Sequence, residues 1–297
     1  MKISVIQSKK KFAYDPTDPG EYDLALCRKL AQPGMEEGFE MVETAAREGA
    51  HLIVTIEGFN ATVSYRDRRY HFSDVSEPLD GPLMRRFCDL SRKYGTYIVG
   101  GLYIGRDGKA TNSAVLFGPE GNIVGIYDKV HLPAGEEQGI TPGDCYPTFE
   151  TEHGRIGLLV CWDMQYPEAA RELALAGVDL IVCPTLGWEN IYGLCRAYEN
   201  GVSIAAAMGL PFDEELWDFC DPSCIVDNMG RIVAAGGRRS SEIVTAELDI
   251  RREPAPQYGA EEITGMDSMR RIRMIQRRPD TYRLITASKP PLFSRYV

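Results

Sequence analysis

The stretch that most constrains the fold runs from residue 154 to 171 and reads GRIGLLVCWDMQYPEAAR. Its first half, Ile156 to Val160, is a short apolar run with a β-branched residue at each end, which is typical of a strand buried on both faces. Pro167 and Glu168 suit the first turn of a helix. Cys161 stands between strand and helix, where backbone N–H groups and the helix dipole favour a thiolate. The stretch predicts an α/β fold with a candidate nucleophile, although most free cysteines are inert and buried.

Elsewhere the chain alternates between strand-like and helix-like segments. Short apolar runs bounded by turn residues predict strands, amphipathic segments predict helices, and paired runs around a tight turn predict hairpins. The expected strands are 2–7, 52–56, 97–104, 180–183, 202–207 and 243–248, the helices are 35–50, 82–94 and 190–200, and the hairpins are 113–127 and 225–233. This order indicates mixed sheets covered by helices, either as one α/β domain or as two similar halves packed sheet to sheet.

Two segments stand apart from this alternation. Residues 9–33 are polar and broken by Pro16, Pro19 and Gly20, so we expect an inserted loop. A loop of that length is either a lid or contact arm, or a plain surface insertion. The tail 263–297 is expected to be helical and then extended. No linker interrupts the chain, so a single domain over residues 1–297 is predicted.

Composition limits the partners and the location of the protein. With 297 residues, of which 44% are hydrophobic, the chain can bury a large core. A net charge of −10 argues against nucleic acid as a partner. No apolar stretch approaches a membrane span and no signal-peptide pattern precedes the first strand, so we expect a cytoplasmic location and no membrane contact. The eight cysteines show neither metal-type nor disulfide-framework spacing, so reduced thiols and no metal are expected.

Two charged residues occupy positions that suit a catalytic site. Glu57 follows the apolar run 52–56, and open α/β sheets place ligands at the carboxyl ends of their strands. Lys129 follows the second strand of the first hairpin, whereas exposed lysines are more natural on a helix surface. Taken alone, each of them also fits an ordinary solvated charge. They become candidates for a catalytic role because the same chain also contains Cys161, the candidate nucleophile.

The motifs around these three residues resemble those of the nitrilase, or carbon–nitrogen hydrolase, superfamily, and the resemblance covers nearly the whole chain. The motifs are VTIEGFN, NSAVLFGPEGNIVGIYDKVHLP, TPGD, LLVCWDMQYPEAAR, RAYENGV and VDNMGRIV. The resemblance implies a four-layer αββα sandwich, in which two mixed β-sheets pack face to face with helices outside. It also implies a catalytic triad of Glu57, Lys129 and Cys161.

The same resemblance implies a second acidic residue near the triad. Many relatives carry a glutamate in a loop of pattern E-x-x-x-aromatic-x-x-G-D. Glu136 has that spacing before Gly143, with Ile140 at the aromatic position, and Glu137 is the weaker alternative. Three aromatic residues are candidates for the substrate pocket by their adjacency to these motifs alone. Core packing explains each of them equally well. They are Phe59, Trp162 and Trp188.

The chemistry fits these residues independently of the resemblance. Cleaving an unactivated amide calls for a strong nucleophile, a proton shuttle and stabilisation of a tetrahedral oxyanion. Cys161 would form a thioester, Glu57 would move the proton, and Lys129 would stabilise the oxyanion. A cationic lysine beside the thiol would also lower the thiol pKa. The expected function is hydrolysis of a small linear amide or N-carbamoyl compound with release of ammonia, without metal or cofactor.

Other functions and assemblies remain open. The segment CWDMQYPEAAR looks closest to amidase and carbamoylase branches, in particular N-carbamoylputrescine amidase-like proteins. The alternatives are a nitrilase, a transferase that passes the same thioester to an amine acceptor, and a non-catalytic member that binds a partner or metabolite in the same pocket. Relatives pair through helices near the cysteine and through their C-terminal tails. The resemblance therefore implies a homodimer or higher homo-oligomer, with contacts in 167–176, 190–200 and the tail.

Overall fold

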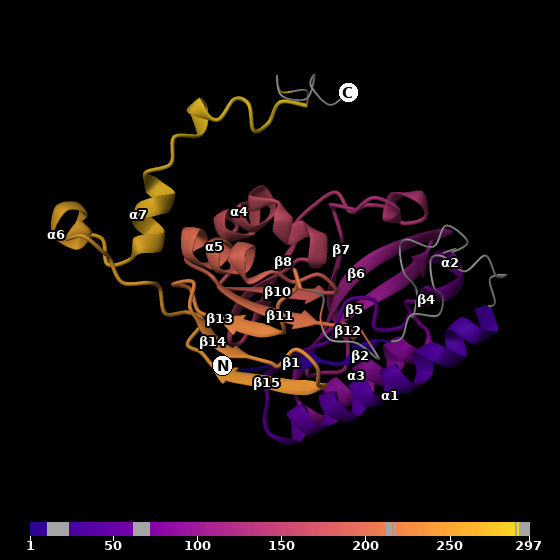
Figure 1. The fold of residues 1–297 in the computed structure, drawn as a ribbon. Helices are drawn as coiled ribbons and strands as arrows, with labels where there is room; N and C mark the ends of the chain where they lie inside the picture. The colour runs from indigo at the N-terminus through magenta and orange to yellow at the C-terminus, as the bar shows by residue number, and fades with distance from the viewer. Residues whose placement is uncertain (11–23, 62–71, 212–215, 217, 289, 291–297) are drawn as a thin grey trace. The chain divides into compact units, whose positions relative to one another are not determined.

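The computed structural model describes residues 1–10, 24–61, 72–211, 216, 218–288 and 290 (Figure 1). Its contacts divide the chain into two units, Met1–Arg252 and Glu253–Val297. The single domain over residues 1–297 stays a prediction. Part of the expected inserted loop, residues 11–23, lies outside the described residues.

Among the described residues, the first sheet of the larger unit contains seven strands. They follow the order β15-β1-β3-β5-β6-β7, with β4 beside β5. The strands are β1 (Lys2–Gln7), β3 (Leu52–Val54), β4 (Glu77–Pro78), β5 (Tyr97–Arg106), β6 (Lys109–Phe117), β7 (Ile123–Asp128) and β15 (Glu242–Glu247). The central strands β1, β3 and β5 run parallel, whereas β15, β6 and β7 pair antiparallel. The sheet is therefore mixed.

Within the described ranges, the second sheet contains six strands in the order β14-β13-β11-β10-β9-β8. They are β8 (Thr148–Thr151), β9 (Gly154–Leu158), β10 (Leu180–Thr185), β11 (Ser203–Met208), β13 (Cys224–Val226) and β14 (Ile232–Ala235). Strands β9, β10 and β11 are parallel and the outer pairs are antiparallel. A separate parallel pair joins β2 (Lys9–Lys10) to β12 (Leu210–Pro211).

The two sheets pack face to face between layers of helices. Strands β1 and β3 of the first sheet contact β11, and β5 contacts β10. Helices α1 (Leu24–Arg47) and α3 (Pro82–Tyr94) cover one outer side, and α4 (Pro167–Leu175) and α5 (Asn190–Asn200) cover the other (Figure 1). A short helix, α2 (Phe72–Val75), precedes β4. The predicted αββα sandwich is confirmed.

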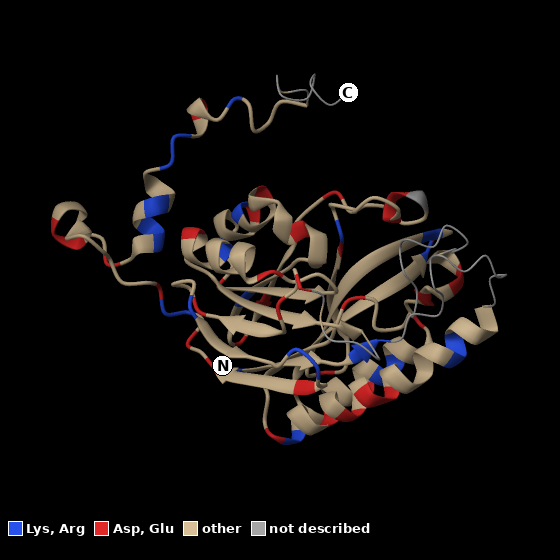
Figure 2. Ribbon diagram, viewed as in Figure 1, with Lys and Arg blue, Asp and Glu red and all other residues tan. Residues whose placement is uncertain are grey.

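Hydrophobic burial explains these layers. Val42, Phe59 and Phe87 belong to one core cluster that joins α1 and α3 to the first sheet. The long helix α1 carries both acidic and basic residues along its length (Figure 2). Its apolar residues therefore pack inward while its charges remain available to water.

Helix α1 begins earlier than predicted. The sequence predicts a loop at 9–33 and a helix at 35–50. The structure instead has one helix that starts at Leu24 and contains Pro33. Cys27 and Ala31 extend its buried stripe from Phe39 toward the N-terminus. Proline removes only one backbone hydrogen bond of the helix, and burial of this stripe compensates for that loss.

The smaller unit contains α6 (Ala260–Thr264), α7 (Met269–Ile275) and a 3₁₀ turn at Pro279–Thr281. The Ser268 hydroxyl caps α7 by accepting the Arg271 backbone N–H at 3.3 Å. The helical part of the tail is as predicted, but the described residues from Pro279 onward form the 3₁₀ turn and further turns rather than the expected extended chain. No helix in the described ranges is long and apolar enough to span a membrane.

Candidate active site

Three of the four predicted catalytic side chains form one buried ionic cluster. Glu57 follows β3, Lys129 follows β7, and Glu136 begins the 3₁₀ turn Glu136–Gln138. The Lys129 Nζ donates to Glu57 Oε1 and to Glu136 Oε2, each at 2.8 Å. Each of the three side chains is at most 3% exposed. The lysine therefore joins two carboxylates that lie far apart in the sequence.

Asn112, in the middle of β6, completes the contacts between the two carboxylates. Its Nδ2 donates to Glu57 Oε1 and to Glu136 Oε1, both at 2.8 Å. Its backbone carbonyl also accepts the Lys129 N–H at 2.8 Å. One residue thus positions all three members of the cluster.

Cys161 meets this cluster from the second sheet. It stands at the first position of the 3₁₀ turn Cys161–Gln165, directly after the strand region of β9, and its φ is +46°. L-residues rarely adopt this left-handed conformation, and such strain is typical of turns that hold a functional side chain. The thiol lies beside the Thr185 hydroxyl, the Leu186 N–H and the Glu57 carboxylate, and each of these groups changes its pKa. All four predicted catalytic side chains therefore meet at one place.

The end of β10 ties the nucleophile to the carboxylate. The Leu186 N–H donates to Glu57 Oε2 at 3.0 Å, while Lys129 binds the other oxygen of the same carboxylate. Both oxygens of Glu57 are therefore held by donors from different sheets. The carboxylate is fixed in orientation before any substrate binds.

Asp163 links the cysteine turn to the segment that carries the lysine. This fully buried carboxylate accepts the Val160 N–H at 3.1 Å within its own turn. It also accepts the Tyr127 hydroxyl at 2.7 Å and the His131 N–H at 2.9 Å, from either side of Lys129. The positions of Cys161 and Lys129 are thus coupled through one side chain.

The environment raises the thiol pKa, contrary to the prediction of a favoured thiolate. Burial raises the pKa of Cys161 to about 12, and the Glu57 carboxylate adds to that effect. Lys129 lowers it, as predicted, but does not outweigh the other two influences. At neutral pH the resting residue is a protonated thiol, and it needs a base to become a nucleophile.

The carboxylates respond to their surroundings in opposite directions. Burial raises the pKa of Glu57, but the charge and hydrogen bond of Lys129 outweigh it and the net shift is downward. For Glu136, burial outweighs the same lysine, and the pKa rises. The pKa of Lys129 is held well above its usual range, because Glu57 and Glu136 together overcome its burial. Glu57 is therefore the more fully ionised of the two carboxylates at rest, and so the one free to accept a proton.

The structure separates Glu136 from its neighbour. Glu136 is 2% exposed and belongs to the cluster, where its Oε1 also accepts the Tyr103 hydroxyl at 3.4 Å. Glu137 is exposed and accepts the Gly135 N–H at 2.7 Å within its own loop. Of the two glutamates, only Glu136 contacts the predicted catalytic residues.

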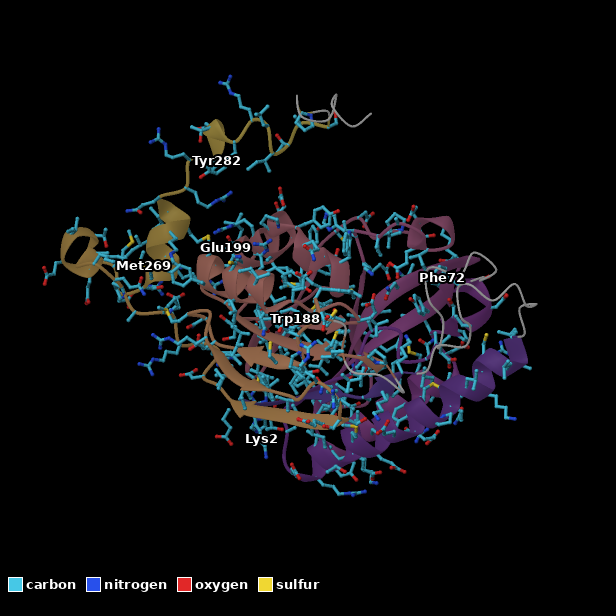
Figure 3. All side chains as sticks on the ribbon, viewed as in Figure 1. Lys2, Phe72, Trp188, Glu199, Met269 and Tyr282 are labelled. Carbon is cyan, nitrogen blue, oxygen red and sulfur yellow. The ribbon has the colours of Figure 1, made fainter. Side chains whose placement is uncertain are left out.

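The three expected pocket residues lie in different surroundings. The Phe59 ring packs edge-on against Phe39, with centroids 5.1 Å apart, in the core under α1. Trp188, labelled in Figure 3, is fully buried and its Nε1 donates to Asn190 Oδ1 at 2.9 Å. Core packing therefore accounts for both of these rings. Trp162 follows the cysteine and is 40% exposed, so it alone of the three is open to solvent.

Sequence reasoning missed the residues that hold the cluster in place. Asn112 lies between Thr111 and Ser113, a polar run inside an otherwise apolar strand, and that run was the available signal. Asp163 belongs to the CWD motif but gives no sign of its partners in β7 and beyond. Lys10 is also buried near Glu57, and nothing in its local sequence predicts this.

Comparisons with known proteins identify the family of the chain. The family model described as carbon–nitrogen hydrolase matches residues 28–255. The chain is similar to the omega-amidase NIT2 of Homo sapiens, with 28% identity over 71% of this chain and 81% of that protein. It is also similar to a probable nitrilase of Schizosaccharomyces pombe, with 32% identity over 60% of this chain and 69% of that protein.

A solved structure extends the similarity over the whole fold. The carbon–nitrogen hydrolase from Helicobacter pylori G27 superposes with a TM-score of 0.69 at 25% identity, covering 96% of this chain and 98% of that one. The family model alone spans well over half of the chain. The chain belongs to the carbon–nitrogen hydrolase family, within the nitrilase superfamily, and is a hydrolase of the amidase type.

Proposed function

We propose that this enzyme hydrolyses a small linear amide or N-carbamoyl compound and releases ammonia through a thioester on Cys161. The single observation that carries the proposal is the position of the Glu57 carboxylate between the thiol and the lysine. It contacts the thiol of Cys161 and accepts the Lys129 Nζ at 2.8 Å. A base, a nucleophile and a cation thus share one buried site.

The first half of the reaction forms the thioester. The Cys161 sulfur attacks the amide carbonyl carbon while Glu57 takes the thiol proton. Lys129 Nζ and the backbone N–H after Cys161 stabilise the negative oxygen of the tetrahedral intermediate. Glu57 then gives its proton to the departing nitrogen, the C–N bond breaks, and ammonia leaves.

The second half releases the acid. Water attacks the thioester carbon while Glu57 accepts one of its protons. The tetrahedral intermediate collapses, the C–S bond breaks, and Glu57 returns the proton to the sulfur. Glu136, whose pKa is raised chiefly by burial, orients the substrate or assists these transfers through Lys129 and Asn112. The thiol pKa of about 12 supports a carboxylate base rather than a pre-formed thiolate.

The test is ammonia release by the wild type and by Cys161→Ala. The panel contains ω-amides of dicarboxylic acids, short aliphatic amides, N-carbamoyl amines, N-carbamoyl amino acids and matched nitriles. The ω-amides come first in the panel because the chain is similar to omega-amidases. The N-carbamoyl amines are included because the CWDMQYPEAAR motif resembles that of N-carbamoylputrescine amidase-like proteins. Turnover of an amide or carbamoyl compound that vanishes in Cys161→Ala is the expected result.

Other outcomes identify other functions. Turnover of nitriles without turnover of the matching amides would make the protein a nitrilase. Full turnover by Cys161→Ala would remove the thioester mechanism. If the folded wild type releases no ammonia from any member of the panel, the proposed substrate class is wrong. The cytoplasmic location stays a prediction from the sequence.

We also propose a homodimer formed through α4 and α5. Helix α5 carries Ile191 and Tyr198, which are 69% and 41% exposed, and Leu175 at the end of α4 is 43% exposed. Large apolar side chains gathered on neighbouring helices favour association, because burial removes their surface from water. Trp162 and Tyr166 lie in the turn before α4 and are also partly exposed.

Sedimentation velocity at micromolar concentration tests this assembly. We expect a dimer or higher oligomer for the wild type and a shift toward monomer for Ile191→Glu, because the new charge would be buried at the interface. The control is Ile232→Glu, which replaces a 42% exposed isoleucine on β14 of the second sheet. A monomeric wild type, or equal dissociation in both variants, would contradict an interface on α5.

A further inference from the structure

Lys10 is a buried lysine that the proposed reaction does not use. It lies in β2, the two-residue strand that pairs with β12 at Leu210–Pro211. Only 4% of the residue is exposed. Burying an ammonium group is costly unless hydrogen bonds and opposite charges compensate for its lost hydration. The partners of Lys10 therefore indicate what it does.

The hydrogen bonds of Lys10 hold the turn that carries Glu57. Its Nζ donates to the Gly58 carbonyl at 2.7 Å and to the Glu57 carbonyl at 3.3 Å. Gly58 has φ +56°, and a Cβ built on it would lie 2.6 Å from the lysine nitrogen. The ammonium group thus occupies the space that a side chain at residue 58 would need. It binds the backbone at the proposed base.

The charge of Lys10 balances the catalytic cluster. Glu57 and Glu136 are both buried carboxylates, and Lys129 supplies only one positive charge between them. Glu57 and Glu136 also act on Lys10, and both favour its protonated form. Burial still lowers the pKa of Lys10 to about 8, so most of the group is charged at pH 7. Two buried ammonium groups then face two carboxylates.

Two further ionisable groups meet the cluster in the described part of the chain: Cys161 acts on Glu57 and Lys129, and the Tyr103 hydroxyl donates to Glu136 Oε1 at 3.4 Å. The groups that change the pKa of Lys10 are Glu57, which follows β3, and Glu136 in its 3₁₀ turn. Helix α1 and strand β12 pack against β2. In the described part of the chain, neither of them contributes a charge that changes the pKa of Lys10. Lys129 acts on the same two carboxylates from the end of β7.

We propose that Lys10 is a positioning residue for the base: it holds the Glu57–Gly58 turn and supplies the second positive charge that keeps the carboxylate cluster ionised. The inference rests on the proposed function, in which Glu57 must be a carboxylate to accept the thiol proton. Removing the ammonium group leaves a net negative cluster. The pKa values of its carboxylates then rise, because the neighbouring opposite charge no longer favours their ionised forms.

The pH profile of kcat/KM tests this role, measured on a substrate that the wild type turns over. For Lys10→Met we expect the acid limb to move up by about one pH unit, since loss of a neighbouring opposite charge raises a carboxyl pKa by about that much. At a pH on that limb, kcat/KM then falls about tenfold. Lys10→Arg keeps the charge and should leave the acid limb near its wild-type position.

Lys9→Met is the matched control, because Lys9 is the other residue of β2 and is more exposed. Its pH profile should superimpose on that of the wild type. A folded Lys10→Met with an unmoved acid limb would overturn the proposal, even if its melting temperature fell. If Lys10→Met fails to fold, Lys10→Gln carries the same prediction, since it retains a donor and removes the charge.

A second measurement separates this inference from the proposed function. The rate at which iodoacetamide alkylates Cys161, followed by mass spectrometry of its peptide, needs no substrate. Loss of the Lys10 charge disfavours the thiolate, so Lys10→Met should be alkylated several-fold more slowly than wild type at pH 7, and Lys9→Met should not. Slower alkylation in a protein that hydrolyses no amide would refute the proposed function but support the role of Lys10. Equal alkylation rates would count against Lys10.

Discussion

A thiol buried beside a carboxylate keeps its proton, and Cys161 is such a thiol. Burial and Glu57 raise its pKa to about 12, although Lys129 acts in the opposite direction. The same carboxylate that raises the thiol pKa is the proposed acceptor of its proton. The resting site thus holds a neutral thiol beside an ionised carboxylate, and in the proposed mechanism the proton moves when the substrate carbonyl arrives.

Glu57→Gln separates these two effects. The charge of Glu57 raises the pKa of Cys161, so removing it should lower that pKa from about 12 by about one unit or more. Turnover should nevertheless fall at least about 100-fold, because the general base is lost. The pH dependence of iodoacetamide alkylation at Cys161 and the rate of ammonia release are the two measurements.

Glu137→Gln is the control for that variant, since Glu137 is the exposed neighbour of Glu136. It should change neither the thiol pKa nor turnover. An unchanged thiol pKa in Glu57→Gln would show that burial alone sets it. Retained turnover would remove Glu57 from the mechanism.

At the scale of elements, the site depends on contacts between segments that belong to different sheets. Lys129 follows β7 of the first sheet, whereas Cys161 follows β9 of the second. Asp163 connects them by accepting donors from Val160, Tyr127 and His131. The His131 ring also stacks on Tyr166 at 3.8 Å between centroids, which fixes the segment after Lys129 against the start of α4. The two sheets are thus held in register at the reacting atoms.

Asp163→Asn should weaken that connection. An amide has one acceptor oxygen, so part of the donor set around residue 163 loses its partner, at a cost of about 1–3 kcal/mol. We expect a lower melting temperature and a kcat reduced about tenfold or more, with a smaller change in KM, because the thiol and Lys129 would no longer be aligned.

The matched control is Asp227→Asn. Asp227 Oδ1 accepts the Met229 and Arg231 N–H groups, both at 2.9 Å, in the hairpin between β13 and β14. An asparagine oxygen can accept the same two bonds, so kcat should stay at the wild-type value. If Asp163→Asn retained wild-type kcat while losing stability, Asp163 would hold the fold without aligning the site.

At the scale of the whole larger unit, the apolar core under the helices and the proposed catalytic cluster occupy different parts of the fold. Phe87 on α3 is fully buried, and its ring lies 4.9 Å from Phe39 and 4.9 Å from Phe117 between centroids. This outer core joins the helices to the first sheet, whereas the catalytic cluster lies at strand ends. Substitutions in the outer core should therefore change stability more than chemistry.

Phe87→Ala tests that separation. Deleting a buried ring should lower the free energy of unfolding by about 3–5 kcal/mol, because transfer energy is lost and a cavity remains. The kcat of the protein that stays folded should change little. Urea unfolding measures the first effect and steady-state kinetics the second, with Phe219→Ala, a 64% exposed phenylalanine, as control. A large fall in kcat at full folding would contradict the separation.

The local pattern of the chain predicts most of its elements. Helices α3 and α5 have the expected bounds, Pro167 begins α4, and the hairpin β6–β7 forms around its predicted turn. Apolar periodicity, proline placement and turn chemistry act over a few residues, so the sequence reports them directly. Helix α1 departs from the prediction because a local proline signal was outweighed by burial of its stripe.

The sequence by itself determined the residue types of the site. They are a cysteine, a glutamate and a lysine, each of which follows a different strand. Only the tertiary structure decided that Glu136 rather than Glu137 joins them, that Asn112 and Asp163 position them, and that Lys10 is buried beside Glu57. It also decided that the thiol pKa is raised rather than lowered. The reason is physical. Burial and charge act through space, between groups whose separation in the chain carries no information about their distance.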